Sequence, residues 1–363
     1  MAERMLVQGN EAVGWGALNA GCDGFFGYPI TPQNEIPEWF AREFPKRGKV
    51  FVQSQSELGS INMLYGGAAA GFRVITSTSS PGWGLMQEGM SHIVAAELPC
   101  VVVLVQRGGP GAGSVRHAQM DYLSATRGGG QGGYKNIVLA PASVQEVHDL
   151  VQLAFYLADK YCNPVVVLSD GIMGLIMESL EMKTIEFGPL PEKPWAMRGR
   201  EKQKDGMARM IHSAPGVAPS RGYMTYLAWL VHMDEKYRQM ANSEVRYEMY
   251  QAEDAKLLVV AYGYPSRVSK EAIKMARAQG LKVGLVRPIT LWPFPTKVIK
   301  DKAEQGCRFL VVEDSLGQMV EDVRMAVQGQ ADVGFLGVQA RHLPTDGGMI
   351  LPGRVLEEIR RFL

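Results

Sequence analysis

Residues 52–78 read VQSQSELGSINMLYGGAAAGFRVITST, a strand–helix–strand pattern around which the rest of the chain is arranged. The pattern predicts the end of a buried strand, a polar turn, a helix that begins at Glu57, and a second strand. Small residues line this helix: Gly59, Ser60, Gly66, Gly67, Ala68, Ala69, Ala70 and Gly71. Each helical glycine costs about 1 kcal/mol relative to alanine, but small side chains let a backbone or a flat ligand come close. We therefore expect a close neighbour or a ligand beside this helix.

Glu57 is the carboxylate at the start of this helix, and it follows the hydroxyl and amide side chains of residues 53–56. Ser54 and Glu57 fit a capping box, in which each side chain binds a free amide of the first helical turn. On the local pattern alone, capping is favoured over a functional role for this carboxylate, and the rest of the chain has to decide between them.

The composition is that of an ordinary globular protein, since 46% of the 363 residues are hydrophobic and 21% are charged. This length allows two domains, each with its own core. The net charge of +1 gives no electrostatic signature of nucleic-acid or anionic-membrane binding. No apolar run approaches the roughly 20 residues of a membrane span, and the first residues lack the apolar core of a signal peptide. We expect a cytoplasmic protein that binds neither nucleic acid nor membrane.

Cysteine and histidine spacing argues against a metal site built by this chain alone. The four cysteines, Cys22, Cys100, Cys162 and Cys307, are far apart and form no CxxC pair. Iron–sulfur and zinc sites usually need such local pairs. We expect buried free thiols and no metal ligands.

The first half of the chain alternates apolar strands with helices. Strands are expected at 25–28, 50–52, 73–77, 101–105, 137–140 and 165–168, and helices at 10–20, 33–43, from 57 onward, 85–95 and 144–160. Continuous Val/Leu/Ile strands between helices indicate an α/β fold with a parallel sheet covered on both faces. Ligands of such sheets bind beyond the carboxyl ends of the strands. The polar and glycine-rich segments follow those ends, at 28–32, 53–57, 76–81, 106–116 and 169–171.

A segment rich in proline, glycine and charge separates this unit from a second one. It contains PLPEKPW, RGREKQKDG and SAPGVAPSRGY, and a polar stretch at 228–250 that we expect to be helical follows it. Such a segment is typical of a linker or of an arm that lies on a partner. The α/β pattern resumes with strands at 257–263, 283–288, 309–313 and 333–337 and helices at 266–279 and 319–327. We expect domains at 1–186 and 251–363, joined by a linker or arm over 187–250.

Three further motifs could carry chemistry. YPITP (28–32) holds Thr31 between two prolines, which would present its hydroxyl rigidly or let it cap the next helix. RGGPGAG (107–113) follows the most apolar strand, so Arg107 could fork onto a carboxylate or phosphate, or could be a solvated loop residue. TSTSSPG (76–82) offers hydroxyl groups to a ligand or to a helix cap.

Taken in order, these motifs resemble a known family. YPITP, QSE before the small-residue helix, TSTSSPG, RGGPGAG and SDG after PVVVL are similar to the alpha subunit of 2-oxoacid:ferredoxin oxidoreductases. LLVVAYG, VRPITLWPFP and VVEDSLGQM resemble the transketolase C-terminal-like domain of that subunit. The combination of RGGPG, a downstream DY and GGGQGGY looks most similar to the branched-chain, 2-oxoisovalerate-type enzymes. The resemblance implies a thiamine-diphosphate-binding fold, with a pyrimidine-binding domain followed by the transketolase C-terminal-like domain.

The resemblance also implies a role for each matched residue. Glu57 would be catalytic and cofactor-binding, because its carboxyl group would share a hydrogen bond with N1′ of the aminopyrimidine and so promote loss of the C2 proton. Pro29 and Ile30 would line the cofactor. Thr31 would contact the substrate carboxylate, and Arg107 would bind that carboxylate or coenzyme A. The reaction would be CoA-dependent oxidative decarboxylation of a 2-oxoacid to acyl-CoA and CO₂, with electrons passed to ferredoxin.

The family's diphosphate motif, GDG before an asparagine-rich turn that holds Mg²⁺, does not occur in this sequence. Asp170-Gly171 is only a fragment of it. The resemblance therefore implies thiamine diphosphate shared with a beta subunit, and Mg²⁺ and iron–sulfur clusters carried only by partner subunits. Those partners would be the beta subunit, a gamma subunit and a ferredoxin-like delta subunit.

Other interpretations stay open at this point. Arg116 and His117 could meet a second carboxylate, which would favour 2-oxoglutarate, or they could face solvent; an aromatic 2-oxoacid is a further alternative. A related thiamine-diphosphate enzyme, such as a decarboxylase or a synthase, would depend on the partner subunit. A non-catalytic scaffold subunit would have no need of Glu57, Thr31 and Arg107 together.

Overall fold

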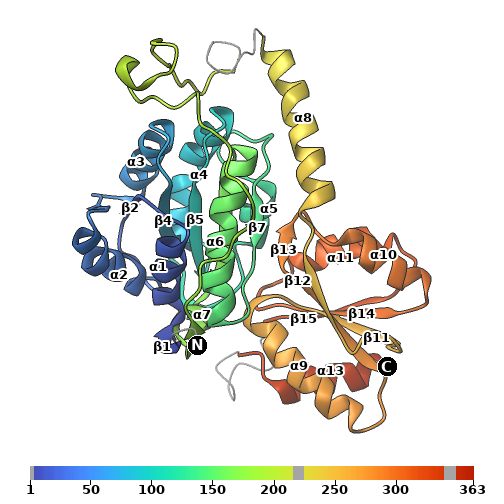
Figure 1. Ribbon diagram of the computed structural model, residues 1–363. Helices are drawn as coiled ribbons and strands as arrows, with labels where there is room; N and C mark the ends of the chain where they lie inside the picture. The colour runs from blue at the N-terminus through green and yellow to red at the C-terminus, as the bar shows by residue number, and fades with distance from the viewer. Residues whose placement is uncertain (1–3, 216–224, 339–348) are drawn as a thin grey trace.

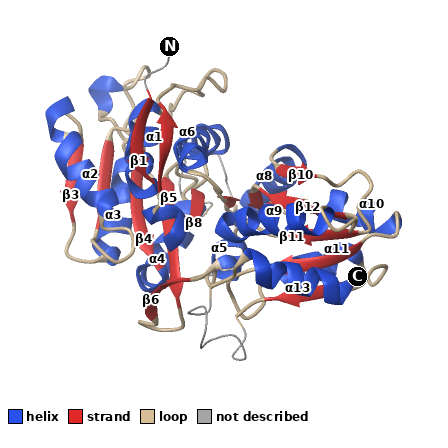
Figure 2. Ribbon diagram, turned by 90° about the horizontal axis from the view of Figure 1, so that it is seen from below, coloured by secondary structure: helices blue, strands red, loops and turns tan. Residues whose placement is uncertain are grey.

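The computed structural model describes residues 4–215, 225–338 and 349–363, which form two α/β units side by side (Figure 1). Segment 216–224 of the expected linker lies outside the described residues. Each unit is a sheet flanked by helices, as the view from below also shows (Figure 2). Within the described parts of the chain, none of the helices has the length and apolarity that a membrane crossing requires.

The first unit is built on a mainly parallel sheet. The strands follow one another in the order β13-β7-β8-β5-β4-β2-β3, with β6 beside β5. Their bounds are β2 (Gly24–Gly27), β3 (Val50–Gln53), β4 (Val74–Ser79), β5 (Val101–Gly108), β6 (Ser114–His117), β7 (Ile137–Leu139), β8 (Val165–Asp170) and β13 (Thr290–Trp292). The helices of this unit are α1 (Gly9–Asn19), α2 (Glu35–Glu43), α3 (Glu57–Ala69), α4 (Ser80–Ala95), α5 (Tyr122–Arg127), α6 (Val144–Tyr161) and α7 (Gly171–Leu175). The neighbouring strands β7, β8, β5, β4, β2 and β3 pair in parallel, whereas β6 and β13 are antiparallel to their neighbours.

Burial on both faces explains the apolar runs of the sequence. In β5, Val102 and Leu104 belong to the apolar cluster that includes α3 and α4, while Val101, Val103 and Val105 belong to the cluster with α1, α2 and α6. Successive side chains of a strand point to opposite faces, so a strand covered on both faces must be apolar throughout. The predicted α/β architecture is confirmed.

The second unit has a five-stranded sheet in the order β10-β12-β11-β14-β15. Its strands are β10 (Tyr247–Tyr250), β11 (Leu257–Val260), β12 (Val283–Pro288), β14 (Arg308–Val312) and β15 (Val333–Leu336). Its helices are α9 (Gly263–Arg277), α10 (Thr296–Glu304), α11 (Met319–Val327) and α13 (Pro352–Phe362). Residues of α9 and α13 share one apolar cluster, and residues of α10 and α11 belong to the other cluster, which continues into the first unit.

The two units are joined by backbone pairing and by buried charge. Strand β13 comes from the second half of the chain but pairs with β7, so that Thr290 lies opposite Leu139. Arg287, which is only 3% exposed, binds both carboxylate oxygens of Glu146 on α6 at 2.7 and 2.8 Å. The expected domain boundary near residue 251 therefore does not separate the two sheets. Strand β10 precedes this boundary and belongs to the second sheet, whereas β13 follows it and belongs to the first sheet.

The segment between the units is an arm followed by the helix α8 (Tyr226–Ser243). The predicted helix at 228–250 was wrong in its second part, since residues 247–250 form β10, antiparallel to β12. Helix α8 is held by Glu97, whose carboxylate accepts hydrogen bonds from Lys236 at 2.7 Å and from His232 at 2.8 Å. Burial opposes ionisation of Glu97, but these two partners outweigh it and lower its pKa to about 2.

Several short elements were not predicted from the sequence. Strands β1 (Arg4–Gln8) and β9 (Met177–Glu181) form a separate antiparallel pair. Two single-turn 3-10 helices lie at Pro45–Arg47 and Arg200–Lys202. Elements β6, α5, α7 and β13 also lack a clear signal, because they are short or depend on a partner distant in sequence. Helices α10 and α13 were missed although both sequences are amphipathic and Pro352 at the start of α13 is a typical first helical residue.

Candidate functional site

The motifs singled out in the sequence meet at the carboxyl ends of neighbouring strands. Residues 28–32 follow β2, residues 54–57 follow β3, Ser80 follows β4, and Arg107 lies at the end of β5. Because β3, β2, β4 and β5 are adjacent and parallel, their loops open at the same edge of the sheet.

Glu57 is the first residue of α3 and is 6% exposed. The capping box predicted for Ser54 and Glu57 was wrong: Ser56 is the N-cap, and its hydroxyl accepts from the amide of Gly59 at 3.4 Å. The hydroxyl of Ser54 instead lies 2.5 Å from that of Ser60. Among the described residues, the Glu57 carboxylate makes no hydrogen bond or ion pair, so it is not spent on capping.

Gly82 of α4 lets the two helices approach at Glu57. A Cβ at position 82 would lie 2.5 Å from both Cγ and Oε1 of Glu57, and closer still to Oγ1 of Thr78. Glycine is therefore required for Glu57 to occupy this position. The expected close approach along α3 itself is mainly packing, since Gly67 faces Val74 and Phe26, and Gly66 faces open space.

The hydroxyl motif at 76–82 does not cap α4 through its side chains. Ser79 is the N-cap, but its hydroxyl makes no cap hydrogen bond. Oγ of Ser79 and Oγ1 of Thr76 are buried, and neither has a partner within the described residues. The hydroxyl oxygen of Ser80 accepts a hydrogen bond from the backbone amide of Arg107 at 3.0 Å and lies 3.2 Å from its carbonyl oxygen.

Thr31 and Arg107 are brought together. The guanidinium of Arg107 donates to the carbonyl of Thr31 at 2.9 Å and to the carbonyl of Ala112 at 2.8 Å. Arg107 is half-buried, and its Nε has no partner among the described residues. The solvated-loop interpretation of Arg107 was therefore wrong, and Thr31 does not cap α2, whose N-cap is Asn34.

Pro29, Ile30 and Thr31 line a pocket of about 430 Å³ together with Phe51 and Gln53. This volume lies within the range of small-molecule sites. The three predicted binding residues of the YPITP motif therefore line one accessible pocket, but neither Glu57 nor Arg107 is among its lining residues.

Asp121 is a candidate site residue that sequence reasoning missed. Its carboxylate accepts a hydrogen bond from Ser80, and burial raises its pKa to about 6 although Ser80 and the charge of Arg107 act in the opposite direction. The sequence signal was present, since Asp121-Tyr122 is the DY of the family motif, but it carried no role. Perturbed carboxylates of this kind are frequent at functional sites.

Arg116 and His117 are partly buried at the contact between the two units. Both bind the fully buried Asp314 of the second unit: His117 Nδ1 lies 2.8 Å from its Oδ2, and Arg116 Nη2 lies 3.5 Å from its Oδ1. The hydroxyl of Tyr264 donates to the same carboxylate at 2.7 Å. These contacts fasten the hairpin that carries Arg107 to the second unit.

Asp170 of the SDG fragment has a structural role in this chain. Its carboxylate accepts from the amides of Met173 at 2.9 Å and Tyr264 at 3.0 Å. Burial raises its pKa to about 6, against the effect of these two donors. No group of three or more His, Cys, Asp or Glu side chains suited to a metal ion occurs among the described residues.

The cysteines are free thiols. Cys22, Cys100 and Cys307 are buried, and Cys162 is half-buried. Burial raises the pKa of Cys22 to about 12 and also raises that of Cys100.

The residues fit the aminopyrimidine end of thiamine diphosphate. Such a group needs a carboxylate that no protein donor already occupies, and Glu57 provides one beside Gly82. The diphosphate end finds no comparable acidic cluster in the described residues, because Asp170 is occupied by backbone amides.

Comparisons with known proteins agree with this site. Residues 15–252 match the family "Pyruvate flavodoxin/ferredoxin oxidoreductase, thiamine diP-bdg", and residues 255–343 match "Pyruvate:ferredoxin oxidoreductase core domain II". The ketoisovalerate oxidoreductase subunit VorB of Methanothermobacter thermautotrophicus is 47% identical over 98% of this chain and 97% of its own length. The 2-oxoglutarate synthase subunit KorA of Methanothermobacter marburgensis is 35% identical over 99% of both chains.

A solved structure extends the match to three dimensions. The 2-oxoglutarate:ferredoxin oxidoreductase from Magnetococcus marinus has a TM-score of 0.81 and 27% identity, covering 99% of this chain. The chain spans 65% of the length of that solved chain. With family matches over both units and a relative of nearly equal length, the chain belongs to the 2-oxoacid:ferredoxin oxidoreductase family, as a thiamine-diphosphate-binding subunit.

Proposed function

We propose that this chain is the alpha subunit of an enzyme that oxidatively decarboxylates a branched-chain 2-oxoacid with coenzyme A, giving acyl-CoA, CO₂ and two electrons for ferredoxin. The observation that carries the proposal is the buried Glu57 carboxylate, which no described residue binds and which Gly82 makes room for. A scaffold subunit would have no need of such a carboxylate.

Thiamine diphosphate, when bound, supplies the carbon nucleophile that allows a 2-oxoacid to lose CO₂. Glu57 would hold the pyrimidine end through a proton shared with its carboxylate, and Pro29 and Ile30 would line the same end. A carboxylate shielded from water is suited to hold and return that proton.

Arg107 would orient the substrate carboxylate or coenzyme A. Two of its N–H groups already fix the loops of Thr31 and Ala112, so the guanidinium is preorganised beside the Thr31 loop. Thr31 would add its hydroxyl from the adjoining loop.

The proposed preference for a branched-chain substrate has two supports. One is the likeness to a ketoisovalerate oxidoreductase subunit over nearly the whole chain. The other is that Arg116 and His117 are engaged with Asp314, which leaves neither of them positioned for a second substrate carboxylate. The likeness to 2-oxoglutarate synthase subunits favours 2-oxoglutarate as the second candidate.

The diphosphate and Mg²⁺ would be held by a beta subunit, and iron–sulfur clusters by the gamma and ferredoxin-like delta subunits or by the beta subunit. The complex would work in the cytoplasm. Purification of the native complex, followed by a viologen-reduction assay with coenzyme A and a panel of 2-oxoacids, tests the whole proposal. Preference for 2-oxoisovalerate over 2-oxoglutarate is expected; the reverse order would favour the second candidate, and no 2-oxoacid-dependent reduction would refute both.

A further inference from the structure

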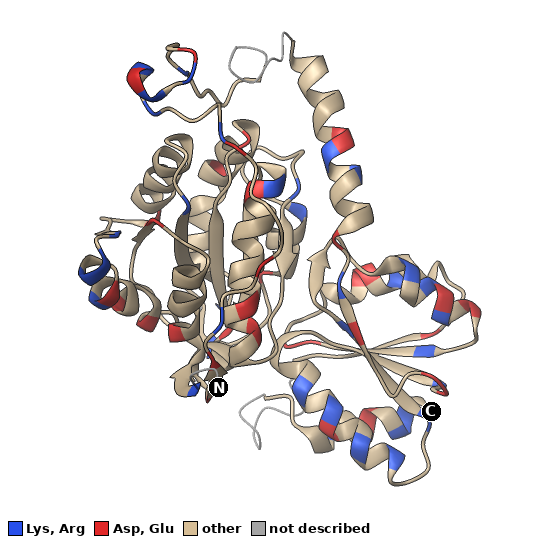
Figure 3. Cartoon of the chain, viewed as in Figure 1, with Lys and Arg blue, Asp and Glu red and all other residues tan. Residues whose placement is uncertain are grey.

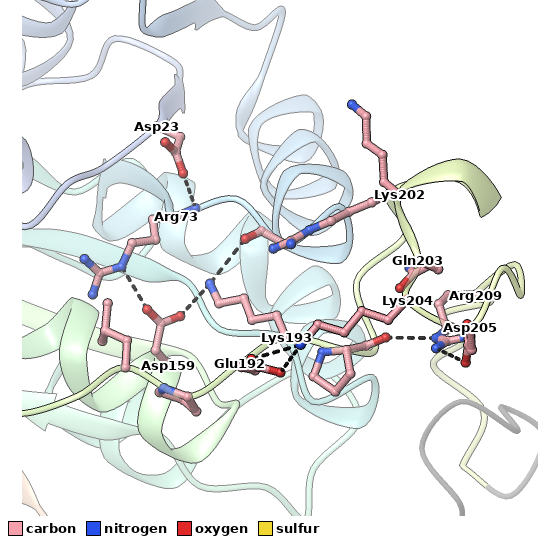
Figure 4. A pocket seen from close by; sticks show the side chains of 15 residues that line it. Asp23, Arg73, Asp159, Glu192, Lys193, Lys202, Gln203, Lys204, Asp205 and Arg209 are labelled. Carbon is pink, nitrogen blue, oxygen red and sulfur yellow. Dashed lines mark hydrogen bonds and ion pairs between the residues drawn. The ribbon is translucent and has the colours of Figure 1, made fainter.

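A pocket of about 660 Å³ lies between the arm and the body of the first unit (Figure 4). Asp23, Gly71, Arg73 and Asp159 of the body line one side, and residues 190–209 of the arm contribute the other. Asp23 directly precedes β2 and Arg73 directly precedes β4, so the pocket is at the amino ends of the strands. Glu57 is at their carboxyl ends, about 20 Å away along a strand of six residues. The pocket is therefore not part of the proposed cofactor site.

We call the part of the pocket formed by Asp23, Arg73, Asp159 and Lys193 its floor, and the charges of these four side chains neutralise one another. Asp159 is held between Arg73 Nε at 2.8 Å and Lys193 Nζ at 2.7 Å, and Lys193 also donates to the carbonyl of Gly71 at 3.3 Å (Figure 4). Asp23 accepts from the amide of Arg73 at 2.8 Å. These fixed contacts give the body side of the pocket a defined shape.

The arm carries the positive charge that is left over. Six cationic and four anionic side chains line the pocket, which leaves two positive charges in excess. Lys204 pairs with Glu192, and Arg209 pairs with Asp205. Arg198 and Lys202 make no side-chain hydrogen bond or ion pair with any described residue. Charged residues gather along the same arm in Figure 3.

The contact between Gly71 and the arm fixes where Arg198 lies. Gly71 has a φ of +88°, and a Cβ there would be 2.6 Å from the Cβ of Ala196 and 3.0 Å from Nη2 of Arg198. The amide of Met197 also donates to the carbonyl of Ala69 at 2.8 Å. The guanidinium is therefore held near the end of α3 by its own backbone and not by an acidic partner.

We propose that this pocket binds a small phosphate-bearing anion between Arg198 and the floor of the pocket, and that Lys202, whose flexible side chain extends away from the floor in Figure 4, turns toward the bound anion. A guanidinium presents a planar fork that matches phosphate oxygens, and an ammonium adds a mobile point charge. The two excess charges match a phosphate dianion, and the volume suits a small ligand. Because the ligand would touch both body and arm, its binding would hold the arm against α3.

The competing explanation is that Arg198 only neutralises the carbonyl end of α3, where a cation is favourable. That explanation requires no ligand and assigns no role to Lys202. Binding measurements separate the two.

Isothermal titration of the full chain with pyrophosphate and, in parallel, with ADP tests the proposal. We expect the parent chain to bind pyrophosphate saturably and one-to-one. In the double variant Arg198→Gln, Lys202→Gln, the affinity should fall roughly tenfold or more for each cation lost. The charge-matched variant Lys297→Gln, Arg361→Gln, whose residues are exposed on α10 and α13, should bind as the parent does. Much tighter binding of ADP would identify a nucleotide as the source of the phosphate, and equal binding would identify a free phosphate compound.

Two results would overturn the proposal. One is the absence of saturable binding up to about 1 mM of either probe. The other is equal binding by the arm variant and the charge-matched variant, which would place the anion elsewhere. Glu57→Gln should leave pyrophosphate binding unchanged, so failure of this proposal and failure of the proposed function are distinguishable.

Discussion

Substitution of Gly82 by alanine should displace the Glu57 carboxylate without changing any functional group of the site. The added Cβ would lie 2.5 Å from Cγ and Oε1 of Glu57, whereas ordinary contact begins at 3.4 Å, so the carboxylate must move by about 1 Å. A misplacement of that size can cost about 100-fold in turnover. The cost in stability is small, because alanine gains about 1 kcal/mol in helix propensity while crowding costs about 1–3 kcal/mol.

Gly84 provides a matched control two residues further along α4. It is exposed, and a Cβ there would meet nothing within 4 Å. Gly84→Ala should keep full turnover and stabilise the helix by about 1 kcal/mol. Both variants are assayed in the assembled complex by CoA-dependent viologen reduction with a 2-oxoacid, together with bound thiamine content and thermal unfolding. Equal turnover of the two alanine variants would refute the view that the position of Glu57 determines catalysis.

Three further outcomes are expected. Glu57→Gln should lower turnover by about 10²–10⁴-fold in the same assay while the melting temperature hardly changes, since no described residue binds this carboxylate; full turnover would favour the scaffold interpretation. Arg107→Ala should lower kcat/KM for the 2-oxoacid or coenzyme A by about ten- to a hundredfold with the cofactor retained, and unchanged kinetics would remove Arg107 from the site. For Asp121, burial raises the pKa to about 6 in the folded chain, so its stabilising effect is present below about pH 4 and is lost as the pH rises through about 6. Urea unfolding across this range should therefore show a steeper loss of stability for the parent than for Asp121→Asn, and parallel curves would contradict this account.

The strands of the first sheet were predicted well because their apolar runs are recognisable in the local sequence, without knowledge of the neighbouring elements. The five valines and leucines of β5 read as a strand whichever element lies beside them, since both faces are covered. Glu57 was likewise found at the start of its helix. The family resemblance then assigned its role, which spacing alone had left open.

The parts that were missed depend on contacts between residues distant in sequence. Strand β13 exists because Thr290 pairs with Leu139, and β10 exists because residues 247–250 pair with β12. Asp314 binds His117 across nearly two hundred positions. A short stretch of sequence contains only one partner of each such pair and therefore gives no sign of the contact. For this reason the predicted helix at 228–250 was extended over the residues that form β10.

The capping error has a more local cause. Ser54 and Ser56 both fit the N-cap pattern, because each has a hydroxyl oxygen that could accept a hydrogen bond from the amide three residues further on. Ser56 is the cap because the helix begins two residues later than the capping box requires, which leaves Ser54 to interact with Ser60 and makes Glu57 the first helical residue. At that position the glutamate cannot fold back onto the cap, and its carboxylate is left for another partner.

The exposed surface of α3 bears on what that partner requires. Leu58 and Met63 are 47% and 40% exposed and Gly66 faces open space, so a strip of exposed residues that is apolar apart from Asn62 continues from Glu57 along the helix. Acid–base chemistry at Glu57 needs water to be excluded, and the described residues of this chain already leave only 6% of Glu57 exposed. We infer that the proposed beta subunit covers this strip, because one surface would then bury the exposed leucine and methionine, complete the enclosure of Glu57, and bring in the diphosphate ligands that the described residues of this chain lack.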